Sequence, residues 1–130
     1  MIARRAKLAS LSTNELVHLF AESAMSRKAA MDALKPKVGN KHFDMMTNIY
    51  VEIKSRGPAA QRSMLPLLNH TDPEVRCNAA ALIMEFAPSQ AEPVLRSLAQ
   101  LDGFVGYEAE VVLEMWEQGE LEFPPYNSPS

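Results

Sequence analysis

The chain contains one cysteine, Cys77, so it cannot form an internal disulfide, and a reducing compartment is the default for such a protein. It also lacks a long apolar run: the longest, residues 79–84, is far shorter than the ~20 residues that a membrane-spanning helix needs. The arginines near its start are not followed by the apolar stretch of an export signal. We therefore expect a cytoplasmic protein.

Motifs that support catalysis or cofactor binding are also missing. The histidines His18, His42 and His70 form no His-x-x-x-His or His-Glu pair, so no zinc motif is present in the sequence. The glycines form no phosphate-binding loop. Cys77 falls on an apolar helix face, which favours a small core residue over a nucleophile. We expect no enzymatic activity, no metal site and no cofactor.

Acidic and basic residues are each scarce in one half of the chain. Residues 1–65 hold 11 Lys+Arg and 5 Asp+Glu, whereas residues 66–130 hold 2 and 11, so the formal charges of the halves are +6 and −9. Such asymmetry can steer an encounter with a charged partner and would allow head-to-tail self-association. It does not decide the fold.

Apolar residues recur at helical spacing and no run alternates with period two, which predicts an all-α protein. Ser12 and Glu15 form the pattern of a capping box, so we predict a helix that begins there and ends before Pro36. The helix is expected to be either continuous or broken near Ser26. Arg27 interrupts its otherwise apolar inward stripe.

Glycine and proline mark the next boundaries. Gly39-Asn40 predicts a turn, with Asn40 as the cap of a helix that ends at Gly57. Pro58 suits the first turn of the following helix, because the N–H that it lacks is not needed there. Pro66 falls inside that helix and should bend it.

A repeat organises the remainder of the chain. Asp72-Pro73 predicts a helix from there to about Phe86, Pro88 opens another, and Asp102 leads to the last. Residues that are 30 positions apart match in kind, which is typical of helical repeat proteins. The matched residues are Pro58/Pro88, Met64/Val94, Leu65/Leu95, Leu68/Leu98, Asp72/Asp102, Val75/Val105, Ala79/Ala109, Ile83/Leu113 and Phe86/Trp116.

The sequence LLNHTDPEVR at residues 67–76, followed by Ala79-Ala80, resembles a HEAT-type, armadillo-like repeat. The chain is also similar, over about residues 13–119, to a small uncharacterised bacterial family of HEAT-like domains with Arg-Gly-Pro before the central repeat. This resemblance implies a short right-handed α-solenoid of about three helical hairpins with a capping N-terminal helix. We expect one domain over residues 12–119, an N-terminal segment at 1–11 and a Pro-rich tail at 120–130.

The resemblance also indicates where a partner would bind. The second helices of such repeats line a concave surface, where this chain would present an acidic and polar ridge; ordinary solvated charge explains the same residues equally well. The alternative surface is a basic patch near the first turn, which could hold phosphate. The ridge comprises Asp44, Asn48, Glu74, Asn78, Glu85 and Glu108, and the basic patch comprises Arg27, Lys28, Lys35, Lys37 and Lys41.

These observations predict a non-catalytic protein–protein interaction module. The alternatives are a nucleic-acid-associated HEAT-like protein and an immunity or antitoxin-like binder. We expect a protein partner that the sequence does not identify, no nucleic acid, no membrane, and a monomer or weak homo-oligomer. In the tail, Phe123 and Tyr126 either fold back on the last helix or form a short docking segment.

Overall fold

A computed structural model describes residues 7–126 of the chain. These residues form helices joined by turns and contain no strand, which confirms the all-α prediction. The chain divides into two compact units, unit 1 (residues 1–63) and unit 2 (residues 64–130). The single domain predicted over residues 12–119 stays a prediction. Residues 1–6 of the N-terminal segment and 127–130 of the tail lie outside the described residues.

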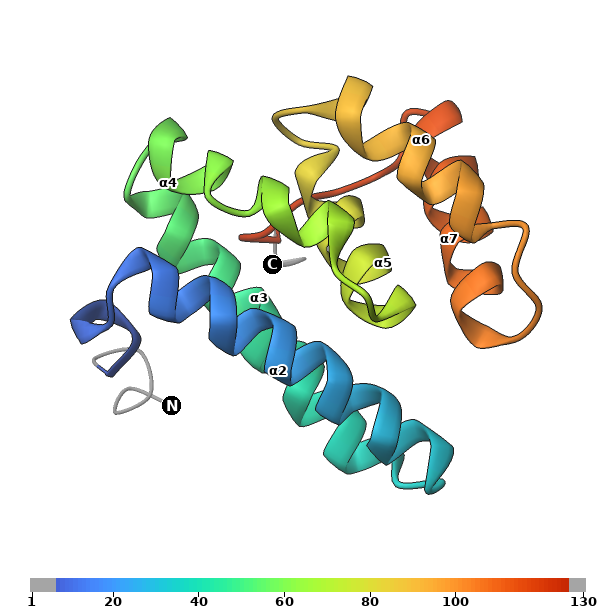
Figure 1. The fold of residues 1–130 in the computed structure, drawn as a ribbon, viewed down its shortest axis with the longest axis horizontal. Helices are drawn as coiled ribbons and strands as arrows, with labels where there is room; N and C mark the ends of the chain where they lie inside the picture. The colour runs from blue at the N-terminus through green and yellow to red at the C-terminus, as the bar shows by residue number, and fades with distance from the viewer. Residues whose placement is uncertain (1–6, 127–130) are drawn as a thin grey trace. The chain divides into compact units, whose positions relative to one another are not determined.

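Unit 1 is built on two neighbouring antiparallel helices, α2 (Thr13–Asp32) and α3 (Pro36–Ser55), as Figure 1 shows. α2 begins as predicted: the Ser12 hydroxyl accepts the Glu15 N–H at 3.0 Å, and the Glu15 carboxylate accepts the Ser12 N–H at 2.8 Å. The helix continues through Ser26 without a break. The buried apolar residues of the two helices are Leu16, Phe20, Ala21, Ala24, Ala30, Met46, Ile49, Tyr50 and Ile53.

The turn predicted at Gly39 and Asn40 is wrong, because α3 already begins at Pro36 and contains both residues. Proline is well suited to the first helical turn. Gly39 is buried against α2 instead. A Cβ atom at Gly39 would lie 2.8 Å from Met31 Sδ, so the glycine allows the two helices to approach closely. The chain therefore reverses earlier than predicted, at residues 33–35.

The bent helix predicted through Pro66 is also wrong. α4 (Pro58–Arg62) begins at its proline as expected, but it is short and is followed by a separate 3-10 helix, η1 (Leu65–Asn69). Pro66 has no N–H to donate to the Arg62 carbonyl, so the α-helical ladder cannot continue through it. Pro66 is accommodated in the first turn of η1.

A guanidinium group holds the N-terminal turn, residues 7–10, in unit 1. Arg56, at the end of α3, donates from Nη2 to the carbonyl oxygens of Leu8 at 3.2 Å and Ala9 at 3.3 Å. Its Nε donates to Glu52 Oε2 at 2.9 Å, which fixes the direction of the side chain. Leu8 is 4% exposed, so the tethered turn contributes to the core. No motif in the sequence indicates this role for Arg56.

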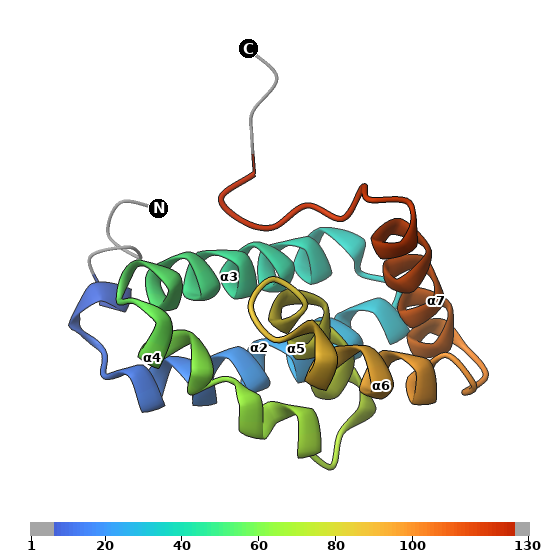
Figure 2. The same cartoon turned by 90° about the horizontal axis from the view of Figure 1, so that it is seen from above.

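Unit 2 contains η1, α5 (Pro73–Ile83), α6 (Pro88–Leu98) and α7 (Phe104–Glu117). α5 contacts η1, α6 and α7, so it is the central helix of this unit. Figure 2 shows α6 and α7 as neighbours. α5 ends earlier than the predicted end near Phe86. The contact between α5 and α7 agrees with the side-by-side packing that the repeat predicted.

Two pairs of equivalent positions are buried alike in α5 and α7, whereas Val75 is buried and its equivalent Val105 is only partly buried. Ala79 and Ala109 are both 0% exposed, as is Ile83, and Leu113 is 7% exposed. The helix starts differ, because Asp72 is the cap of α5 whereas Gly103, with a φ of 89°, precedes α7. The sequence repeat therefore predicts the shared buried positions better than it predicts the helix caps.

Residues 120–126 of the tail follow α7 without forming another helix, as predicted for a Pro-rich segment (Figure 2). Gly119 ends α7 with a φ of 72°. Pro124 is buried, whereas Tyr126 is 46% exposed. Partial burial, and then the negative charge of Glu122, raise the pKa of Tyr126 above its ordinary value. The choice between a folded-back tail and a docking segment stays a prediction.

Candidate functional site

The turn that leads into α5 is fixed by side-chain hydrogen bonds. Asp72 Oδ1 accepts the Glu74 N–H at 2.8 Å, and His70 Nδ1 accepts the Asp72 N–H at 3.0 Å. Arg76 Nη1 donates to the carbonyl oxygens of His70 at 2.7 Å and Thr71 at 3.2 Å. These contacts satisfy the backbone at the start of the helix. They give His70, Asp72 and Arg76 a structural role in unit 2.

The predicted concave ridge is distributed over both units. Glu74 is only 3% exposed, so it does not project into solvent as we expected for a ridge residue. Asn78 Nδ2 donates to the Glu74 carbonyl oxygen at 2.8 Å, which draws the amide toward its own helix. Asp44 is exposed, and the remaining members, each of intermediate exposure, are Asn48, Glu85 and Glu108.

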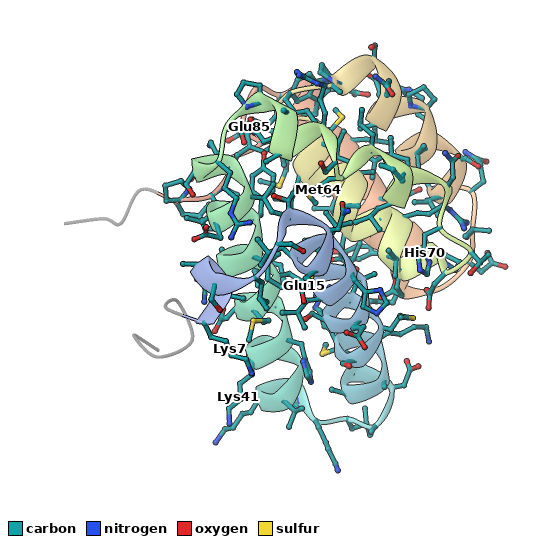
Figure 3. All side chains as sticks on the ribbon, turned by 60° about the vertical axis from the view of Figure 1, so that its left-hand side comes forward. Lys7, Glu15, Lys41, Met64, His70 and Glu85 are labelled. Atoms are coloured by element: carbon teal, nitrogen blue, oxygen red, sulfur yellow. The ribbon has the colours of Figure 1, made fainter. Side chains whose placement is uncertain are left out.

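The predicted basic patch is brought together around the α2–α3 turn of unit 1. The Arg27 guanidinium lies over the Phe43 ring at 5.3 Å from its centroid, a cation–π contact that explains a charge in the apolar stripe. Lys28 Nζ pairs with Asp32 Oδ2 at 2.5 Å. Figure 3 shows Lys41 near this turn. The exposed lysines of the patch are Lys28, Lys35, Lys37 and Lys41.

An open depression of about 550 Å³ lies between η1 and α6 in unit 2. No ionisable side chain lines it. The sequence did not predict this depression, although Pro66 at its edge was expected to bend a helix. A proline ring inside or beside a helix changes the surface contour and removes a donor, and two of them on neighbouring helices are the only sequence indication of the site. The lining residues are Leu65, Pro66, Leu68, Asn69, Ser89, Gln90, Pro93 and Val94.

The groups with chemical reactivity are separated within the described chain. Cys77 is 3% exposed, which confirms its prediction as a core residue. His18 Nε2 lies 3.8 Å from Glu22 Oε1 on an exposed helix face, the solvated arrangement expected for that spacing. Residues 7–126 contain no group of three or more His, Cys, Asp or Glu side chains that could hold a metal ion. No helix among those residues is long and apolar enough to cross a membrane.

One ion-pair cluster joins α6 and α7 within unit 2. Arg96 Nη2 lies 2.5 Å from Glu92 Oε2 and 3.6 Å from Glu117 Oε1. The hydrogen bond to Glu92 and its negative charge raise the pKa of the Arg96 guanidinium. Because the side chains are exposed, such pairs stabilise a fold by little. We therefore interpret this cluster as a contact between α6 and α7 and not as a functional site.

Comparison with known proteins gives a family and a related structure. Residues 14–115 match the family described as "Domain of unknown function (DUF2019)". The crystal structure of the protein RPA1889 from Rhodopseudomonas palustris CGA009 is similar, with a TM-score of 0.83 and 26% sequence identity. The match covers 88% of this chain and 96% of that chain. No curated protein matches the sequence. The expected likeness to an uncharacterised family is thus confirmed at the level of DUF2019.

Proposed function

The chain belongs to the DUF2019 family, and we propose that it is a non-catalytic protein-interaction module built as a short HEAT-like stack. The support for the repeat architecture lies in unit 2, where α5 and α7 are in contact and bury equivalent residues. The right-handed stack of about three hairpins and the capping role of α2 belong to this proposal. The expected cytoplasmic location is also part of this proposal.

The depression between η1 and α6 is the observation that carries the proposed function. Its volume of about 550 Å³ is within the range of ligand-binding clefts, but it is open and its lining is uncharged. Leu68 and Val94 offer apolar contact, while Asn69 and Gln90 offer amide donors and acceptors. This combination suits a short segment of a partner protein, whose apolar side chain and backbone amides would both be satisfied.

Elements of fixed geometry support this surface from both sides. The turn between η1 and α5 is held by His70, Asp72 and Arg76, and α5 contacts both η1 and α6. A preformed surface loses little conformational entropy when a partner binds. The ridge of Asn78, Glu85 and Glu108 is a weaker candidate, because Asn78 is used within its helix and the two glutamates are only partly exposed.

The binding proposal is tested by placing a photo-crosslinking residue at Gln90, which is exposed at the depression. In a lysate of the native cell we expect one dominant protein adduct at Gln90. The same crosslinker at Tyr107, exposed on α7, serves as the matched control. Ser89→Arg, which fills the depression from an exposed helix position, should abolish the adduct. Equal crosslinking from both positions, or an adduct unaffected by Ser89→Arg, would refute the proposed site.

The stack itself needs a separate measurement. Spin labels on cysteines introduced at Asp44 of α3 and Glu110 of α7, both exposed, report on the distance between the units. Cys77 is buried and should not take up the label. One narrow distance distribution is expected for a continuous solenoid. A broad distribution would show that the units move independently and would contradict the stack.

A further inference from the structure

An exposed leucine occupies a backbone conformation that favours glycine at the end of α2. The Lys35 N–H donates to the Ala30 carbonyl oxygen at 2.8 Å and the Leu34 N–H to that of Met31 at 3.1 Å, the bond pattern of a Schellman motif. Leu34 is the residue with positive φ in this motif, at 59°, and it is 87% exposed. An L-residue with a Cβ is strained in this region, and glycine is the common choice.

A Schellman motif also ends α7, and there the residue with positive φ is a glycine. Gly119 has a φ of 72°, and the Glu120 N–H donates to the Met115 carbonyl oxygen at 2.8 Å. The two caps therefore differ in one respect: one holds a glycine and the other a leucine whose side chain is almost fully in solvent. Neither helix capping nor core packing accounts for Leu34. Its side chain is available for a contact outside the chain.

The surroundings of Leu34 are basic and partly apolar. Val38, in the first turn of α3, is 41% exposed, and Lys35, Lys37 and Lys41 are exposed around the same turn. The acidic side chain nearest in sequence, Asp32, is paired with Lys28. The remaining cation of the patch, Arg27, lies over Phe43. The tip, defined here as residues 34–41, thus combines protruding aliphatic groups with positive charge.

This combination distinguishes between classes of partner. Single-stranded nucleic acid is bound by stacking on aromatic side chains, which residues 34–41 lack. The phosphate contacts that hold a duplex do not require an exposed leucine at a strained backbone position. Protein interfaces are enriched in arginine and depleted in lysine. Lysines beside aliphatic side chains suit an anionic lipid surface, where the stems of the lysines lie along apolar groups and their ammonium groups meet the headgroups.

We propose that the tip docks on a surface of anionic lipid, with Leu34 and Val38 entering the interface and Lys35, Lys37 and Lys41 contacting the phosphate groups. This proposal departs from the expectation, drawn from the sequence, of no membrane partner. The contact is peripheral and reversible, because it uses two small apolar side chains and a few charges. It is independent of the depression in unit 2. The charge of the headgroups, rather than a particular lipid species, determines the attraction.

The test is sedimentation of the full chain with vesicles of phosphatidylcholine alone or mixed with phosphatidylglycerol. We expect binding to the mixed vesicles only, and its loss at high salt. Lys35→Gln/Lys37→Gln should weaken partitioning about 25-fold, at about fivefold for each lysine. Leu34→Gly should weaken it about tenfold. Because glycine suits the backbone there, this variant is expected to fold.

Matched controls separate the tip from general charge and general apolarity. Lys7→Gln/Arg62→Gln removes the same charge from exposed positions outside the tip, and Tyr107→Ser removes an exposed apolar group. Both variants should bind mixed vesicles as the parent does. Equal binding to neutral vesicles, no binding at low salt, or equal weakening by the control pair would overturn the proposal. So would a tip-dependent mobility shift of a DNA duplex without vesicle binding.

Discussion

Unit 1 rests on two helices of 20 residues each, whereas the α-helices of unit 2 contain 11, 11 and 14 residues. The formal charge also differs between the two units. Because Met64 and Leu65 are uncharged, the formal charges of +6 and −9 belong to units 1 and 2 respectively. The compact units therefore coincide with the change of charge along the chain. We expect this opposite charge to steer the two units toward differently charged partners.

The two units also use buried helical glycines differently. In unit 1, a Cβ at Gly39 would meet Met31 Sδ at 2.8 Å, the flexible end of a side chain. In unit 2, a Cβ at Gly106 would lie 1.9 Å from the Leu101 carbonyl oxygen and 2.9 Å from its carbon, which are backbone atoms. A side chain can move to another rotamer, but a backbone within a packed turn cannot move without disturbing the helix.

The largest expected effect therefore separates these two glycines. Gly106→Ala should lower the free energy of unfolding by about 3 kcal/mol or more, because the new methyl group overlaps the backbone. Gly39→Ala should change it by less than about 1 kcal/mol, since the gain in helix propensity offsets the displacement of Met31. Denaturant unfolding of both variants measures the difference. Similar decreases in the free energy of unfolding for the two variants would contradict this prediction. They would show that the packing around Gly39 in unit 1 is as rigid as the backbone around Gly106 in unit 2.

Hydrogen exchange can assign each loss to a unit. Gly106→Ala should speed exchange in α7 and its neighbours in unit 2 before it affects α2 and α3. Uniform acceleration in both units would mean that they unfold as one cooperative body. The difference between Gly106 and Gly39 would then describe local packing, and the two units would not differ in stability.

The second prediction concerns the cap that unit 2 uses at its central helix. Asp72→Ala should lower the free energy of unfolding by about 1.5 kcal/mol, because the side chain that accepts the Glu74 N–H is lost and the turn held by His70 is loosened. Asp72→Asn keeps an acceptor oxygen and is the matched control. Thermal unfolding of the two variants side by side provides the measurement. An equally large decrease in the free energy of unfolding for Asp72→Asn would show that the charge of Asp72, and not its hydrogen bond to the Glu74 N–H, stabilises the helix start.

Local chemistry explains why the helix starts were predictable. Ser12, Pro58, Asp72 and Pro88 lie at or beside the helix starts where the sequence placed them, since capping and the fixed φ of proline act within a few residues. The repeat also predicted the contact of α5 with α7, because both helices bury the matched pairs Ala79/Ala109 and Ile83/Leu113.

The errors arose where a residue's role depends on distant partners. Gly39 has the sequence pattern of a turn, but its contact with Met31, on another helix, decides that it lies inside α3. Glu74 was expected in solvent at the start of a helix and is buried. The depression beside Pro66 and Pro93 depends on how two helices meet. The local pattern of a single sequence does not show which helices meet or where.

The third prediction tests whether Leu34 is a strained residue, as the comparison of the two Schellman motifs implies. Leu34→Gly should raise the free energy of unfolding by about 0.5 kcal/mol: relief of about 1 kcal/mol or more at positive φ is partly offset by the greater entropy of glycine in the unfolded chain. Gly119→Ala, the reverse change at the other cap, should lower it by about 1 kcal/mol. Thermal unfolding of both variants is sufficient. Destabilisation by Leu34→Gly would show that the leucine side chain contributes to the fold.

The smallest expected effect concerns the capping box at the start of α2 in unit 1, and it appears as a dependence of stability on pH. The backbone N–H and the hydroxyl of Ser12 both lower the pKa of Glu15 below its ordinary value. A carboxyl group with a lower pKa in the folded state contributes stability above its unfolded pKa, and this contribution is lost as the pH falls through the folded pKa. Glu15→Gln should therefore unfold with a shallower dependence on pH than the parent between about pH 6 and pH 3. Unfolding free energies of the two proteins across that interval measure the difference, and parallel curves would mean that Glu15 makes no pH-dependent contribution to the start of α2.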